Sequence, residues 1–222
     1  MIPTTLADYA PRLSNRLLAG AGLMQITTHR IPVLSHGFAE DATVSITCRE
    51  LDVAHLPDRD IEFEIGKQAL EWDTTMAVAS LHGKAQIRWS PGAGPTRTGR
   101  LELSELTLHW PAGSTHIDLD SVDATTVPLD EFAVHEAIAA VGRERLGSLQ
   151  EMVHLGLCEG VTLSDTARPL CCHLRHRTWI GDVDRSGIMV VSTNCERVVT
   201  TLVSMSAIAE NEADLARLLT TS

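Results

Sequence analysis

The chain has 222 residues, of which 44% are hydrophobic and only 4% are aromatic, so aliphatic side chains must build most of its core. It carries 18 basic and 29 acidic residues, which gives a formal net charge of −11. A surface that acidic repels phosphate backbones and anionic lipids, which argues against nucleic acid or a membrane as the main partner.

The five cysteines are an odd number and show neither a CxxC pair nor a regular spacing. This pattern argues against a disulfide framework and against a cysteine-rich zinc site. The start of the chain has no basic stretch followed by an apolar run, which argues against a signal peptide, and no window approaches a membrane span. We therefore expect a soluble protein of the reducing cytoplasm.

Residues 4–19 predict an opening helix. Leu13 and Leu17 recur at helical spacing on one apolar stripe, and Gly20 would end the helix. Pro11 would fit badly in mid-helix, so the start of the helix is expected to slip towards it.

From residue 22 to about residue 122 the hydrophobic period changes to two, which is typical of strands. Residues 61–65, IEFEI, alternate apolar and acidic side chains. Residues 75–89 predict one long strand, and 31–38 and 114–122 predict shorter ones. Six or seven short strands joined by tight turns favour an antiparallel barrel.

Residues 129–157 return to helical spacing, with Gly142 and Gly147 as points where the helix would weaken or divide. Four strand-like segments follow, and residues 184–187 predict a hairpin turn between two of them. Residues 210–220 predict a closing helix. The chain is thus expected to form an α+β protein.

Residues 171–177, CCHLRHR, are the densest group of metal-binding side chains in the chain. Pro169 and the β-rich sequence that follows predict a strand over 170–180. On a strand, His173 and His176 point to opposite faces, so they do not converge on one ion. The sequence therefore predicts no metal site here.

Two histidines lie on predicted apolar faces, where an imidazole is either an axial haem ligand or a buried, hydrogen-bonded side chain. His36 shares a strand face with Leu34 and Phe38. His135 lies along the same helical line as Leu146. The sequence alone leaves both interpretations open for each.

No motif for a nucleophile elbow, a metalloprotease helix, a phosphate-binding loop or a dinucleotide fold occurs, so no catalytic residue is assigned. Asp182 and Asp184 share a predicted strand face beside Trp179. They suit either a general acid–base pair or two solvated carboxylates that flank a turn, and the sequence favours the second interpretation.

The order of elements resembles the haem-utilisation branch of the pyridoxamine-phosphate-oxidase-like split barrels, in which a small α/β domain follows the barrel. Residues 16–48 look like the family's helix, two strands and turn, and residues 76–89 like its long central strand. Residues 134–157, 178–191 and 210–220 are similar to the opening helix, hairpin and terminal helix of the second domain. The resemblance implies a split barrel over residues 1–127 and an α/β domain over 128–222.

The resemblance also implies a homodimer that holds its ligand between the subunits. Relatives include haem-binding and haem-degrading proteins, and a plant relative that binds the tetrapyrrole-synthesis enzyme glutamyl-tRNA reductase. Flavin is unlikely, because only Arg49 and Arg59 stand where flavin-binding relatives present a basic cluster. The haem degraders use a histidine near the C-terminus or at the dimer interface, and no histidine follows His176.

The resulting hypothesis is a non-enzymatic haem- or tetrapyrrole-linked binding or regulatory protein, with His36 and His135 as candidate haem ligands. Two alternatives remain open at this point: a haem-degrading oxygenase of the split-barrel class and a flavin-dependent oxidoreductase. Whether the protein is an enzyme is not decided by the sequence.

Overall fold

A computed structural model describes most of the chain and divides it into two compact units. The described residues are 6–69, 77–91, 94–110, 113–130, 134–136, 139, 142–157, 160–167, 176–194, 196–205 and 207–221. The barrel unit comprises Ala10–Lys67 and Ala79–Pro128, and the C-terminal unit comprises the described parts of Met1–Tyr9, Gln68–Val78 and Leu129–Ser222.

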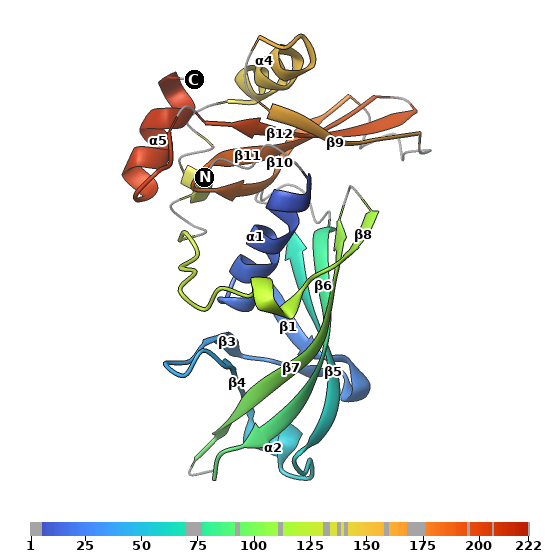
Figure 1. The fold of residues 1–222 in the computed structure, drawn as a ribbon, viewed down its shortest axis with the longest axis vertical. Helices are drawn as coiled ribbons and strands as arrows, with labels where there is room; N and C mark the ends of the chain where they lie inside the picture. Colours follow the sequence, from blue (N-terminus) through green and yellow to red (C-terminus); the bar gives the residue numbers. More distant parts are fainter. Residues whose placement is uncertain are drawn as a thin grey trace. The chain divides into compact units, whose positions relative to one another are not determined.

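The barrel unit is a curled, antiparallel eight-stranded sheet, with the part of α1 (Leu6–Leu18) that follows Tyr9 beside it (Figure 1). The strand order is β2-β1-β5-β6-β7-β4-β3, and β8 pairs with β7. The remaining elements of this unit are β1 Leu23–Ile26, η1 Thr27–His29, β2 Ile31–Pro32, β3 Ser35–Phe38, β4 Val44–Arg49, α2 Glu50–Val53, β5 Arg59–Gln68, β6 Ala77–Trp89, β7 Thr96–Trp110, β8 Gly113–His116 and η2 Leu119–Ser121.

Residues 31–38 form both edge strands of this sheet, β2 and β3. The amide of Val33 donates to the carbonyl of Met24 at 3.0 Å, and the next amide, Leu34, donates to Thr47 at 2.7 Å. The chain therefore leaves β1 and joins β4 within two residues, so 31–38 is two short strands rather than the single predicted strand. The predicted antiparallel split barrel is confirmed.

Alternating burial explains why the long strands form. In β5, Ile61, Phe63 and Ile65 are buried while Glu62 is exposed, as the IEFEI pattern predicts. The predicted long strand is confirmed as β6. At Gly83 an added Cβ would overlap the ring of Phe63, so this glycine makes room for the aromatic core of the barrel.

The opening helix α1 is confirmed, and its apolar stripe of Leu13 and Leu17 is fully buried. The expected slip of its start towards Pro11 is wrong, because the helix begins at Leu6 and passes through the proline. The buried stripe stabilises the helix enough to keep this residue inside it.

The C-terminal unit is built on a four-stranded antiparallel sheet of order β10-β11-β12-β9. Its elements are α4 Arg143–His154, β9 Gly160–Ala167, β10 Thr178–Asp184, β11 Gly187–Thr193, β12 Arg197–Ser204 and α5 Glu212–Thr221. The predicted hairpin turn is confirmed, since Asp184 pairs with Gly187. Side chains of one sheet face pack with α4 and α5 into a common apolar cluster: Leu146, Leu149, Ile180, Val183, Ile188, Val190, Val203, Leu215 and Leu218.

A bulge decides which residues of β10 reach that cluster. The pairing register shifts between Ile180 and Asp182, so Gly181 is the extra residue. Ile180 and Val183 therefore face the same side although they are three positions apart. Trp179 and Asp182 face the other side.

The segment 129–157 divides at Gly142, one of the two glycines expected to weaken it, because Gly142 adopts a φ of +80° directly before α4. Two other sequence predictions fail in detail. Gly147 lies inside α4 without breaking it. The strand over 114–122 ends at His116, where the chain turns into η2.

Among its described residues, 176–180, the predicted strand over 170–180 starts later than expected. His176 has a φ of +54° and lies in a turn, and β10 begins only at Thr178. Residues 170–175, which carry most of the CCHLRHR segment, lie outside the described residues, so the absence of a metal there stays a prediction.

No helix in the described part of the chain is both long enough and apolar enough to cross a membrane.

Candidate functional site

His36 lies in the middle of β3, on the inward face of the curled sheet. It pairs with Ile46 of β4, whose side chain is fully buried, and paired residues of an antiparallel sheet point to the same side. The imidazole is half-buried. Its position on an apolar sheet face is the one that the strand pattern predicted.

The ring of His36 is fixed by the end of α1. Its Nε2 lies 2.8 Å from the carbonyl oxygen of Leu17. Because a carbonyl oxygen only accepts, Nε2 must carry the hydrogen of this bond. A residue 19 positions earlier in the chain therefore orients the imidazole.

Burial lowers the pKa of His36 below its ordinary value, because desolvation penalises the charged ring. The backbone carbonyls of Leu17 and Ala21 raise the pKa by a smaller amount. Near neutral pH the ring is therefore predominantly neutral. Neutral imidazole is the form that binds a metal ion.

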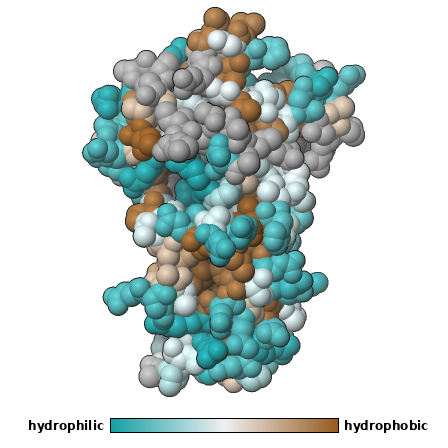
Figure 2. All heavy atoms as spheres, in the orientation of Figure 1, coloured by the Kyte–Doolittle hydropathy of each residue, from teal (hydrophilic) through white to brown (hydrophobic). Residues whose placement is uncertain are grey.

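Apolar side chains near His36 in the sequence remain accessible. Leu34 is 50% exposed, and Phe38, which pairs with Val44, is partly exposed. Figure 2 shows an apolar area on the near face of the barrel unit. A flat apolar ligand gains by covering surface of this kind.

His36 has two features of an imidazole that could hold a haem iron. A histidine that binds iron must be unprotonated at the binding nitrogen, and its other ring nitrogen usually donates to a carboxylate, a backbone carbonyl or water. His36 is kept neutral by burial and is anchored by Leu17 through Nε2. A ligand bound through Nδ1 would leave that anchor in place.

His135 belongs to the C-terminal unit and lies in a short helical segment, 134–136. Its side chain is half-buried, while the preceding residue, Val134, is 2% exposed and belongs to the apolar cluster of this unit. His135 and Leu146 do not share one face of a continuous helix as expected, because the positive φ of Gly142 interrupts the helical backbone between them. The structure thus places the two candidate histidines in different units.

A second group of histidines, which the sequence analysis did not single out, lies on the outward face of the barrel sheet. His82 of β6 and His109 of β7 meet edge to face, with ring centroids 4.7 Å apart. The Ser80 hydroxyl donates to Glu64 at 2.6 Å and accepts from His82 Nε2 at 3.0 Å. Both histidines occupy outward positions in strands whose side chains alternate between the two faces of the sheet. Their contact depends on the register between β6 and β7, which the sequence did not reveal.

Glu64 is the anionic end of this network. The hydrogen bond from Ser80 is the main cause that lowers the pKa of Glu64, and the nearby His82 and His109 lower it further. The carboxylate is therefore ionised at neutral pH. Within the described ranges no group of three metal-binding side chains is arranged to hold an ion.

A hollow of about 210 Å³ opens beside this network. Its lining is mostly polar and charged: Thr27, Glu62, Phe63, His82, Gly83, Lys84, Glu105 and Thr107. Lys84 is already paired with Glu105 at 2.7 Å. Pockets that enclose drug-sized ligands measure roughly 300–1,000 Å³ and are mainly apolar, so this hollow does not suit a porphyrin.

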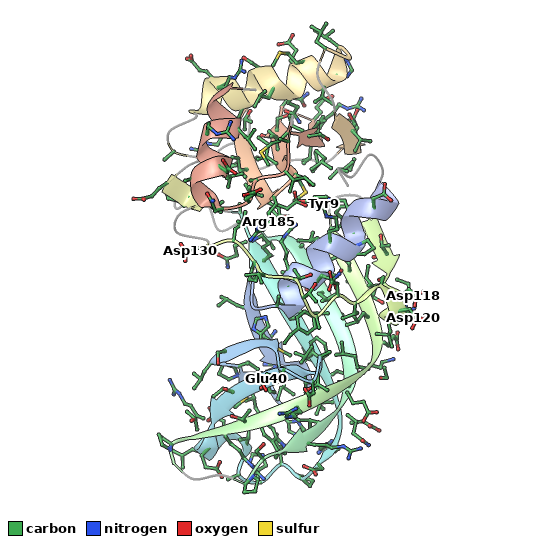
Figure 3. The ribbon with its side chains drawn as sticks, turned by 60° about the vertical axis from the view of Figure 1, so that its left-hand side comes forward. Tyr9, Glu40, Asp118, Asp120, Asp130 and Arg185 are labelled. Carbon is green, nitrogen blue, oxygen red and sulfur yellow. The ribbon has the colours of Figure 1, made fainter. Side chains whose placement is uncertain are left out.

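Asp182 and Asp184 are not the solvated carboxylates that the sequence favoured. They are 1% and 2% exposed. The hydroxyl of Tyr9, in the same unit near the start of α1 (Figure 3), donates to Asp182 Oδ2 at 2.5 Å. Asp184 Oδ1 accepts the amide hydrogens of Ser186 and Gly187. Asp184 therefore closes the hairpin turn. For Asp182 the prediction failed because its partner Tyr9 lies 173 positions away in the chain.

No family model matches the chain, and no curated protein matches it. Among solved structures, it is similar to a haem-binding protein from Mycobacterium smegmatis, with 12% identity and a TM-score of 0.49 over 96% of this chain and 95% of that chain. A second solved chain matches with 16% identity and a TM-score of 0.35 over 52% of this chain and 98% of that chain. Both similarities are too distant to assign a ligand to this chain.

Proposed function

We propose that the protein is a non-enzymatic binding protein for haem or a related tetrapyrrole, with its site in the barrel unit at His36. The resemblance of the chain's layout to the haem-utilisation branch suggests the class of ligand. The observation that carries the location is a half-buried His36 that burial keeps neutral and that the Leu17 carbonyl anchors.

In this proposal the residues of the chain supply binding and orientation. Haem supplies an iron that takes a nitrogen ligand and a flat apolar ring. His36 provides the nitrogen, and the accessible side chains of Leu34 and Phe38, two residues away on either side in the sequence, provide apolar surface. The carbonyl of Leu17 keeps the imidazole in place.

His36 is preferred over the outward pair of His82 and His109. The side chain of His82 is 49% exposed, and the hollow beside it is lined by carboxylates and an ammonium group. A porphyrin placed there would remain in water and would lie against charge. The apolar inward face of the sheet avoids both costs.

The proposal includes self-association, because the split-barrel resemblance implies a homodimer. Leu23 and Leu34 of the barrel unit are 76% and 50% exposed, and exposed leucines of this kind gain by burial in an interface. Light scattering at micromolar concentration should give twice the chain mass of 24.1 kDa. A mass of one chain would overturn the dimer and leave the haem site to its own test.

The proposed regulatory role adds a tetrapyrrole-synthesis enzyme as a protein partner. Such a role predicts that haem changes the affinity for that enzyme, because two ligands of one protein are coupled reciprocally. Calorimetric titration of the partner enzyme with and without haem would measure this coupling. Equal affinities in the two titrations would remove the regulatory part of the proposal.

Titration of the ligand-free protein with haem tests the function itself. We expect a saturable Soret band. After incubation with flavin mononucleotide and removal of the unbound flavin, we expect the protein to show no flavin absorbance. Reductant is then added in air. A persistent Soret band supports a binding protein, whereas conversion to a bile pigment supports the oxygenase alternative. A titration without a saturable Soret band would contradict the proposal.

A further inference from the structure

The end of α1 has a specific geometry that bears on His36. The amide of Ala21 donates to the carbonyl of Arg16 at 3.0 Å, and the amide of Gly20 donates to the carbonyl of Leu17 at 3.3 Å. Gly20 has a φ of +120°. This pair of bonds around a glycine is the Schellman motif, which satisfies the last carbonyls of a helix.

The Leu17 carbonyl accepts two hydrogen bonds. One comes from the Gly20 amide within the motif, and the second comes from Nε2 of His36 at 2.8 Å. A carbonyl oxygen has two lone pairs, so both bonds are satisfied together. In the neutral ring the hydrogen of this bond is then on Nε2 and the lone pair is on Nδ1, and the Ala21 carbonyl is a weaker second partner of the ring.

The turn and β3 also touch through their main chains. A Cβ on Gly20 would lie 3.0 Å from the carbonyl oxygen of His36, closer than nearly all real contacts of this kind. A Cβ on Gly37 would lie 3.5 Å from the carbonyl oxygen of Ala19. The backbone that carries the imidazole is therefore packed directly on the turn.

We propose that the Schellman turn at the end of α1 is the positioning element of the haem site, and that it presents Nδ1 of His36 as the nitrogen that binds iron. The inference rests on the proposed function and adds to it the identity of the ligating atom. The Nε2–H bond to Leu17 stays in place when the ligand binds. Loss of an outer partner of this kind lowers metal affinity by about 10- to 100-fold.

A long-range proton–nitrogen NMR spectrum of the ligand-free protein tests the first half. We expect His36 to show a protonated Nε2 and an unprotonated Nδ1, with the signals assigned by their loss in His36→Gln. A spectrum with the hydrogen on Nδ1, or with rapid exchange between the two forms, would overturn the assignment. This measurement needs no haem.

Addition of zinc protoporphyrin, which is diamagnetic, tests the second half. We expect the Nδ1 resonance of His36 to shift while the Nε2–H signal persists. A shift at Nε2 together with loss of its hydrogen would leave haem binding intact and would refute the choice of nitrogen. If neither haem nor zinc protoporphyrin binds, the proposed function fails and this half fails with it.

The role of the turn is tested with Gly20→Ala against Gly66→Ala, since a Cβ on Gly66 meets nothing within 4 Å. We expect Gly20→Ala to move the His36 ring signals and to weaken haem binding by about 10- to 100-fold. Gly66→Ala should change neither. A Gly20→Ala protein that unfolds at lower temperature but keeps wild-type ring signals and haem affinity would show that the turn is merely structural.

Discussion

The hydroxyl of Tyr9 donates a hydrogen bond of 2.5 Å to Oδ2 of Asp182, although the two residues are 173 positions apart. Tyr9 is fully buried and Asp182 is 1% exposed. Hydrogen bonds to a charged acceptor are short, and a buried carboxylate that loses one is left poorly solvated. This contact ties the N-terminal residues of the C-terminal unit to its sheet.

Tyr9→Phe should therefore lower the free energy of unfolding by about 1–3 kcal/mol, because it removes one donor from a buried acceptor. Urea unfolding measures the change. Asp182→Asn and the double variant complete a cycle that isolates the pair from the other contacts of Asp182. If the effects of the two substitutions on the free energy of unfolding were additive, the hydroxyl and the carboxylate would contribute independently. The hydrogen bond between them would then not stabilise the fold.

Gly83→Ala should destabilise the barrel unit by about 1–3 kcal/mol, because the added methyl group overlaps the ring of the buried Phe63. Gly66→Ala is the matched control, since it adds the same methyl group to the neighbouring strand β5 where the space is open. Thermal unfolding of the two variants gives the comparison. Equal stability of the two would show that Phe63 does not need the space above Gly83.

Local patterns predicted the strands because buried and exposed side chains alternate along a strand in the same way as apolar and polar residues alternate in the sequence. The IEFEI segment became part of β5 with its apolar residues inside, and the glycine after α1 ended that helix. Gly142 divides the expected helix, as its place in the sequence indicated. The patterns failed where one extra residue changes the period, because the bulge at Gly181 turns Val183 to the same face as Ile180.

The candidate site was predictable only in part. Strand alternation placed His36 on an apolar face, but its partner Leu17 depends on how a helix end meets β3. The contact between His82 and His109 depends on the register of β6 and β7. No local pattern carries such information, because these contacts join residues that are distant in the chain.

Cys48 gives a prediction for alkaline pH. Burial, assisted by the negative charge of Asp52, raises the pKa of Cys48 to about 11 from an ordinary value of 9.0. A raised folded-state pKa stabilises the fold below the unfolded-state pKa, and this contribution is lost as pH rises through the folded-state value. The difference in unfolding free energy between wild type and Cys48→Ala should therefore shrink between pH 9.0 and about 11.

Urea unfolding of the two proteins at several pH values measures this difference. Both proteins share the other four cysteines, so the ionisation of those thiols cancels in the comparison. A difference that stays constant up to the higher pH would show that the Cys48 thiol ionises as easily in the folded protein as in the unfolded chain.

His135→Ala should act on stability rather than on ligand binding. The side chain is half-buried and follows Val134 of the apolar cluster in the C-terminal unit, so its truncation should cost about 1 kcal/mol of stability. His154→Ala, an exposed position in the same unit, is the control and should change stability less. A His135→Ala protein of wild-type stability that loses its Soret band would move the haem ligand from His36 to His135.

The most direct test of the account is the haem titration of His36→Ala beside His109→Ala, a histidine on the outward face of the same sheet. If His36 binds the iron, its removal shifts or abolishes the Soret band, while His109→Ala keeps the wild-type spectrum and affinity. An unchanged spectrum and affinity in His36→Ala would contradict the proposed site.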